Sequence, residues 1–168
     1  MENYILIGNV VAMVSAIIML IAGLVKKKKS ILIAQILQMI TAGISNWILR
    51  SAAGVINNLI GCLRNLLCYK NKFGLKEKIV VALLATVFTI YFNDIGFIGY
   101  LPLLSTLFYI VFINVEDVIK LKLVVATTIF LWLIHDIYIK SYIYALFDIG
   151  AIIANLISVI LIKSKSKK

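Results

Sequence analysis

Residues 123–162 read LVVATTIFLWLIHDIYIKSYIYALFDIGAIIANLISVILI, two long apolar runs separated only by Lys140 and Ser141. A helix that crosses a bilayer needs about 20 mostly apolar residues at about 1.5 Å of rise per residue. Both runs have about this length, so the stretch predicts a transmembrane helical hairpin. The whole chain shares this character, because 63% of its residues are hydrophobic and its mean hydropathy is +1.08. We therefore predict an all-α integral membrane protein.

Seven apolar stretches fill most of the 168 residues, so little of the chain is left outside the bilayer. The predicted transmembrane helices are Tyr4–Val25, Ile31–Leu49, Ala52–Tyr69, Ile79–Phe92, Gly96–Val115, Leu123–Ile139 and Tyr142–Ile162. Pro102 lies in the fifth span, where its missing backbone hydrogen bond is expected to let the helix bend. Any function is expected inside this helical bundle.

Lysine clusters carry most of the net charge of +10. They follow the first, third and fifth spans and close the chain, and together they hold fourteen of the 17 basic residues. The clusters are Lys26–Lys29, Lys70 to Lys78, Lys120 with Lys122, and Lys163 to Lys168. By the positive-inside rule, the N-terminus is predicted outside the cell and the C-terminus in the cytoplasm. Nucleic-acid binding is not expected, because it needs a basic patch on a folded soluble face.

Spans five to seven align with spans one to three at an offset of 90 residues. The matched polar positions include Asn58 with Asp148, Asn65 with Asn155, and Arg50-Ser51 with Lys140-Ser141. This pattern predicts a 3+1+3 parallel repeat, in which a binding site lies near the midplane between the halves. The predicted parts are a first three-helix bundle (1–70), a cytoplasmic loop with a linker helix (71–94), and a second three-helix bundle with a basic cytoplasmic tail (95–168).

Polar residues gather on one face of the third span and on the matching face of the seventh. The third span carries Gly54, Asn58, Gly61, Asn65 and Cys68, and the seventh carries Tyr144, Asp148, Ala151, Asn155 and Ser158. Residues spaced by three and four positions share a helix face. These faces predict a solute pathway with Asn65 and Asn155 near mid-depth. Amides and small residues also hold helices together, so helix packing is the alternative.

Asp148 lies about two turns inside the seventh span, too deep for its short side chain to reach the headgroups. A carboxylate there must be protonated, paired or hydrated, which makes it a candidate proton or cation site. The alternative is a structural pair with Arg64 or Lys140. Arg64 itself is predicted to act inside the bundle, as a pairing residue, gate or anion contact, or to extend towards the cytoplasmic headgroups.

His135 lies near the outer end of the sixth span, one turn after Trp132. A histidine in this place could relay protons, because its charge changes near neutral pH. The alternative is an interfacial histidine beside a tryptophan of the aromatic belt. We predict that His135 and Asp148 form a titratable outer gate, and that Trp132 contacts the substrate.

The sequence contains no known catalytic or metal-binding motif. It has one histidine, no Cys-x-x-Cys or His-Glu-x-x-His run, and no phosphate-binding loop. An intramembrane enzyme would need a nucleophile with a base within reach. We expect no enzymatic activity, no cofactor and no metal.

The run from Trp132 to Asp136, followed by Ser141, Asp148 and Asn155, resembles the signature stretch of the YgjV family of bacterial inner-membrane proteins. The segment from Ser51 through Leu67, with Arg64 near its end, is also similar. The resemblance covers most of the chain from Gln35 onwards. It implies a multi-pass protein of the bacterial inner membrane.

More distantly, the 3+1+3 plan is similar to the SWEET sugar transporters of the MtN3/PQ-loop superfamily. Those proteins carry a pocket asparagine on the third helix of each three-helix unit, the place of Asn65 and Asn155 here. They also use several prolines as hinges, whereas this chain has Pro102 alone.

These patterns predict a transporter or facilitator for a small polar solute, working by alternating access around a central site. The residues expected to contact substrate are Asn58, Asn65, Trp132, Asn155 and Ser158, and the expected gate residues are Arg64, His135 and Asp148. The alternative is a receptor, regulatory or scaffold bundle that uses the same residues for partner binding or helix packing. The expected partners are the solute and the lipid bilayer, and assembly into a homo-oligomer is left open.

Overall fold

Each of the seven apolar stretches forms an α-helix in the computed structural model, which describes residues 3–165. Glu2 and the tail lysines Lys167 and Lys168 lie outside the described residues. The elements are α1 (Asn3–Leu24), α2 (Lys28–Ile48), α3 (Ala52–Tyr69), α4 (Leu75–Phe92), the 3-10 helix η1 (Gly96–Tyr100), α5 (Leu101–Phe112), α6 (Val118–Tyr138) and α7 (Tyr142–Lys165). The predicted all-helical fold with seven helices is confirmed.

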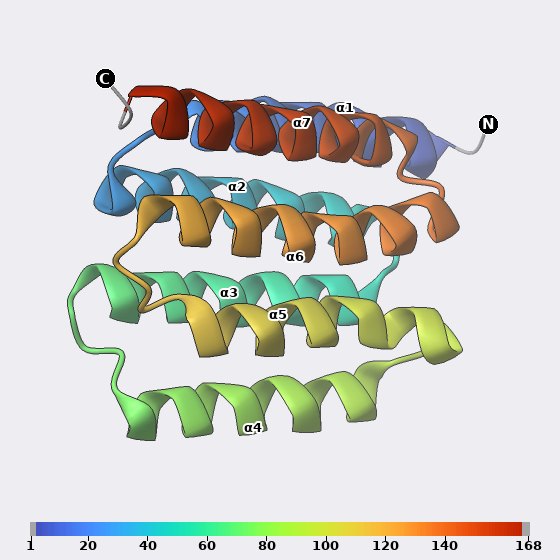
Figure 1. The fold of residues 1–168 in the computed structure, drawn as a ribbon. Helices are drawn as coiled ribbons and strands as arrows, with labels where there is room; N and C mark the ends of the chain where they lie inside the picture. The colour runs from blue at the N-terminus through green and yellow to red at the C-terminus, as the bar shows by residue number, and fades with distance from the viewer. Residues whose placement is uncertain (1–2, 166–168) are drawn as a thin grey trace.

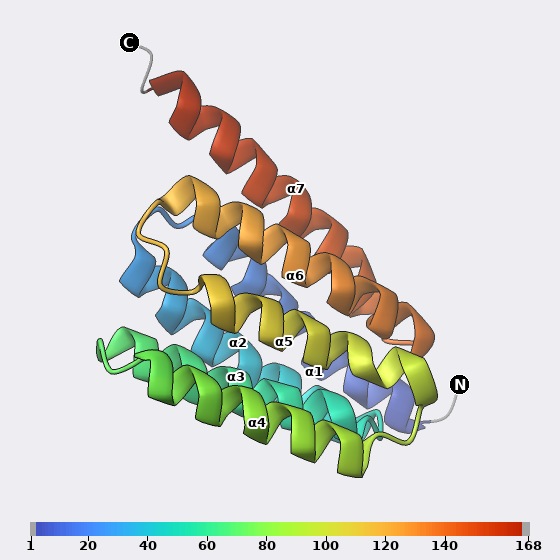
Figure 2. The same ribbon diagram turned by 60° about the horizontal axis from the view of Figure 1, so that its bottom comes forward.

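The helices form two rows of three, and α4 closes one edge (Figure 1). One row holds α1, α2 and α3, and the other holds α7, α6 and α5. The rows meet where α1 packs on α7 and where α3 packs on α5. Figure 2 brings the α4 edge forward and shows α4 beside α3 and α5, the two helices that it contacts. The middle helices of the two rows are α2 and α6.

Four helices of the described residues are long and apolar enough to cross a membrane, namely α1, α2, α6 and α7. The prediction of seven spans is therefore supported for these four by length and composition. The other three helices differ for local reasons. α3 carries strongly polar side chains along its length, α4 begins with Lys76, Glu77 and Lys78, and α5 has only 12 residues after the turn of η1.

The bundle has an apolar outer surface and an unusually polar interior. Large exposed apolar side chains cover α1, α4 and α7, among them Leu83, Leu146 and Ile160. Asn65 and His135 are completely buried. Water would favour the reverse distribution, whereas a hydrocarbon solvent accepts apolar side chains outside and requires polar groups to face the bundle interior.

Lys122 does not lie in the connection after the fifth span, where the sequence pattern placed it. The Asp117 carboxylate accepts hydrogen bonds from the backbone N–H groups of Ile119 (2.8 Å) and Lys120 (3.4 Å). This cap starts α6 at Val118 and carries Lys122 into the bundle, where it is 1% exposed. The prediction that Lys122 lies in the connection between the fifth and sixth spans is therefore wrong.

Pro102 lies in the first turn of α5 instead of the middle of a longer helix. The residues before it, Gly96–Tyr100, form the separate 3-10 helix η1, which starts at the positive φ of Gly96 (64°). A first-turn residue needs no intrahelical N–H bond, so proline is well tolerated there. The expected proline bend within the fifth helix is therefore not found, because Pro102 lies where α5 begins.

The hairpins α2–α3 and α6–α7 turn in the same way, 90 residues apart. Arg50 and Lys140 each have a positive φ, 60° and 61°. The next residue, Ser51 or Ser141, donates its backbone N–H to the carbonyl oxygen five residues earlier, at 2.9 and 2.8 Å. This is the Schellman ending of a helix, which here forces an immediate reversal of the chain.

A contact between neighbouring helices also recurs at the same offset. The Ser15 hydroxyl of α1 donates to the Gln38 carbonyl of α2 at 2.8 Å. The Ser105 hydroxyl of α5 donates to the Thr128 carbonyl of α6 at 3.2 Å. Each row is thus held by an equivalent hydrogen bond between its first and middle helices.

We expect Ser15→Ala and Ser105→Ala to lower the stability of the protein by similar amounts, each about 0.6 to 1.7 kcal/mol, as for interhelical side-chain hydrogen bonds in other membrane proteins. The check is the unfolding transition of the purified protein in detergent. Thr127→Ala is the control, because the exposed Thr127 hydroxyl bonds only to Leu123 of its own helix. A large loss at one serine and none at the other would contradict equivalent packing.

Candidate functional site

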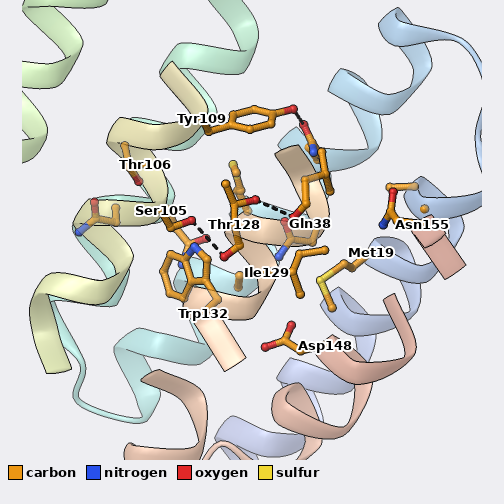
Figure 3. A pocket seen from close by; sticks show the side chains of 18 of the residues that line it. Met19, Gln38, Ser105, Thr106, Tyr109, Thr128, Ile129, Trp132, Asp148 and Asn155 are labelled. Atoms are coloured by element: carbon orange, nitrogen blue, oxygen red, sulfur yellow. Dashed lines mark hydrogen bonds between the residues drawn. The ribbon is translucent and has the colours of Figure 1, made fainter. Parts of the chain in front are cut away.

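A cavity of about 90 Å³ lies between the two helix rows. Among the described α-helices only α4 contributes no lining residue, and α2 and α6 together contribute just over half of the lining residues. Figure 3 shows Gln38 from α2 and Thr128, Ile129 and Trp132 from α6 around this space. Tyr109 lies at one end and Asp148 at the other (Figure 3). The cavity is thus long, central and lined by both polar and apolar side chains.

The end of the cavity near the lysine-rich connections carries two buried cations. Arg64 of α3 is 3% exposed and donates from Nε to the Asn65 Oδ1 at 3.1 Å. Its guanidinium carbon lies 4.1 Å from the centre of the Tyr109 ring, a cation–π contact. Lys122 of α6 donates from Nζ to the Gly23 carbonyl at 2.6 Å. Both side chains line the cavity.

The opposite end of the cavity carries two carboxylates, Asp136 of α6 and Asp148 of α7. Asp136 is paired, with its Oδ1 3.0 Å from Nδ1 of the buried His135. Asp148 is 2% exposed, and its Oδ2 has no hydrogen-bond partner among the described residues. The Tyr144 hydroxyl, one turn earlier on α7, is also buried and lies near Ser15 of α1. The unpartnered oxygen of Asp148 favours a site that a polar ligand or water completes.

Ser51, His135 and Asp136 form a continuous buried chain of polar contacts. The Ser51 hydroxyl lies 3.3 Å from the His135 Nε2, and the His135 ring reaches Asp136 on its other side. These residue types also form hydrolytic triads. Here, however, the Ser51 Oγ accepts the Gly54 N–H as the N-cap of α3, which gives the serine a structural role. The chain joins the α2–α3 hairpin to the cavity wall.

Five of the predicted site residues line the cavity, namely Asn58, Arg64, Trp132, Asp148 and Asn155. The other three do not. His135 lies behind Asp136, and Ser158 is buried farther along α7. Asn65 lies behind Arg64, and its amide donates to Gln35 Oε1 at 3.2 Å. The structure therefore brings the amides of α3 and α7 towards one space without placing Asn65 on its wall.

Apart from Trp132, sequence reasoning missed the lining residues of the two middle helices. On α2 these include Gln35, Gln38 and Asn46, and on α6 they include Lys122 and Asp136. The spacing of Gln35, Gln38, Ala42 and Asn46 follows one helix face, so the signal was present in the sequence. Residues 3–165 contain no group of three or more metal-ligating side chains.

An apolar exterior, a polar interior and four helices of membrane-spanning length define a multi-pass helical membrane protein. The family model Imp-YgjV, described as bacterial inner membrane protein, matches residues 6–166. The chain therefore belongs to the Imp-YgjV family of bacterial inner membrane proteins, as the sequence resemblance indicated. This membership fits a multi-pass location in the inner membrane. Searches of curated proteins and of solved structures gave no match.

Proposed function

We propose that this protein carries a small polar solute across the bacterial inner membrane through the cavity between its two helix rows. The observation that supports this proposal is the cavity itself, a space of about 90 Å³ among buried polar side chains. Charged and amide groups inside a bilayer are energetically unfavourable unless they meet a partner, water or a substrate. A central site with a few convergent polar groups is the usual form of a small-molecule site.

The two rows are proposed to be a 3+1+3 parallel repeat of the kind found in SWEET transporters. The matched hairpins and the matched serine bonds support this proposal. The cavity lining supports it further, because each α2 residue on its wall has an α6 counterpart on the wall at the offset of 90. These pairs are Ile31 with Leu121, Gln35 with Val125, Gln38 with Thr128, Met39 with Ile129, Ala42 with Trp132, and Asn46 with Asp136. Rocking of two such halves would expose a central site to each side alternately.

In this proposal all seven helices cross the membrane, with the N-terminus outside and the C-terminus in the cytoplasm. The lysine-rich connections support this orientation. The Arg64 end of the cavity then faces the cytoplasm, and Asp148 with the His135–Asp136 pair forms the outer gate. Asn58, Trp132 and Asn155 contact the solute, and Asn65 positions the Arg64 guanidinium.

The alternative is a receptor or scaffold bundle without transport. Direct bonds between helices favour it, because the Asn57 amide donates to the Thr89 hydroxyl at 2.9 Å and Asn65 reaches Gln35. A scaffold needs no water-filled route to its centre, whereas a transporter does. Access of water to the cavity wall therefore distinguishes the two functions.

Neighbouring threonines on α6 provide a matched test of that route. Thr128 lines the cavity, whereas Thr127 is exposed on the outer surface. In a background with Cys62→Ala and Cys68→Ala, we expect Thr128→Cys to react with a charged, water-soluble thiol reagent at least tenfold faster than Thr127→Cys. A hydrocarbon environment keeps a charged reagent away from Thr127. Equal, slow labelling of both cysteines in membranes would favour the scaffold.

Transport itself is tested in liposomes that contain the purified protein. Vesicles are incubated with a mixture of sugars, nucleosides, vitamins, amino acids and small organic acids, washed, and analysed by mass spectrometry. We expect at least one small polar compound to accumulate above the level in protein-free vesicles. No enrichment of any compound, together with slow labelling at Thr128→Cys, would overturn the proposal.

A further inference from the structure

We infer that the solute is a small organic monocarboxylate whose anionic group binds at the end of the cavity that Arg64 and Lys122 line. This inference rests on the proposed function and assigns the substrate class of the same cavity. Three features of the molecule carry it: two buried cations without acidic partners, a guanidinium fixed in orientation, and apolar walls around a small volume.

Arg64 and Lys122 are both almost completely buried, and both line the cavity. Among the described residues neither has a carboxylate within the 4.0 Å of an ion pair, since the ion pair that forms there is His135–Asp136. Asp136 is 14 residues from Lys122 on α6, about 21 Å of helix rise. A buried charge without a counter-ion is strongly unfavourable, so an anion bound beside these cations would be correspondingly favoured.

The surroundings of Arg64 orient its guanidinium for an anion. The Tyr109 ring lies against the guanidinium, and Asn65 accepts its Nε–H group. The Tyr109 hydroxyl is in turn held by a bond to Gln35 Oε1 at 2.9 Å. A guanidinium fixed on these sides still has the N–H groups of its terminal nitrogens, which match the two oxygens of a carboxylate. Lys122, anchored on Gly23, supplies a second positive charge.

The volume and walls of the cavity limit what can accompany the anionic group. A cavity of about 150 Å³ holds benzene, so about 90 Å³ suits roughly four to six heavy atoms. Ile31, Leu121, Val125 and Ile129 form apolar parts of the wall. These side chains favour a short hydrocarbon portion, as in propionate or lactate, over phosphate or sulfate, which would leave them facing polar oxygens.

The test is ligand binding to the purified full-length protein in detergent, measured by isothermal titration. We expect propionate, lactate and pyruvate to bind, whereas the neutral propionamide, propylammonium and inorganic phosphate bind at least tenfold more weakly. Arg64→Gln and Lys122→Met should each weaken carboxylate binding at least tenfold. Lys120→Gln is the control, because Lys120 is exposed on the same helix.

Unchanged carboxylate affinity in both Arg64→Gln and Lys122→Met would overturn the inference, as would tighter binding of propionamide than of propionate. Arg64→Lys retains the positive charge and loses the paired N–H donors of the guanidinium. It therefore separates the contribution of charge from that of paired hydrogen bonding if Arg64→Gln does not fold. Vesicle uptake separates this inference from the proposed function. Uptake of a neutral or cationic solute alone would contradict the carboxylate inference and support the transport function. Carboxylate binding without uptake of any solute would support the carboxylate site and contradict the transport function.

Discussion

Replacing His135 with leucine should destabilise the protein by about 1 to 3 kcal/mol, the cost of leaving a buried hydrogen-bonding group without its partner. His135 is 0% exposed, and its Nδ1 lies 3.0 Å from the Asp136 Oδ1. Without the imidazole, the carboxylate stays buried with no side-chain partner. The measurement is unfolding of the purified protein by sodium dodecyl sulfate, compared with the wild type.

The double variant His135→Leu/Asp136→Leu provides the decisive comparison. It removes both polar groups, so we expect it to be more stable than His135→Leu alone, because no unpaired buried polar group remains. His135→Gln should recover part of the loss, since its amide can still donate to Asp136. A single variant that is as stable as the double variant would show that the pair contributes little to folding.

The helices were predictable because each apolar run is long and bounded by charged residues. The positions of the two hairpins in the sequence were predictable, since Arg50-Ser51 and Lys140-Ser141 interrupt continuous apolar sequence. Their backbone geometry, with positive φ at Arg50 and Lys140, has no marker such as glycine there. The start of α6 was missed because Asp117 acts as a helix cap, which placed Lys122 inside the bundle.

The candidate site was only partly predictable, because periodicity shows which residues share a helix face and not which helices lie in the middle. The polar faces of α3 and α7 pointed to Asn58, Asp148 and Asn155, which do line the cavity. The two rows, however, place α2 and α6 at their centres. The wall formed by Gln35 and Gln38 follows from that arrangement, which no local pattern encodes.

In the proposed transporter, filling the cavity should abolish uptake while the fold persists. Ala42 is buried in the middle of α2 and lines the cavity, where its counterpart at the offset of 90 is Trp132 of α6. The ring of Ala42→Phe would occupy much of the roughly 90 Å³. Because added side-chain volume in a filled interior costs about 1 to 3 kcal/mol, and here enters open space, we expect a folded protein. Vesicle uptake of the transported solute should fall at least a hundredfold.

Leu37→Phe is the matched control for this variant, because it enlarges a side chain of the same helix that faces outward. Leu37 is 52% exposed, so an added ring there meets lipid and leaves the cavity unchanged. Uptake by Leu37→Phe should stay within about twofold of the wild type, as expected for a change at an outer position. Normal uptake by a folded Ala42→Phe would mean that the solute takes another route, since a ring and a solute cannot occupy one small space together.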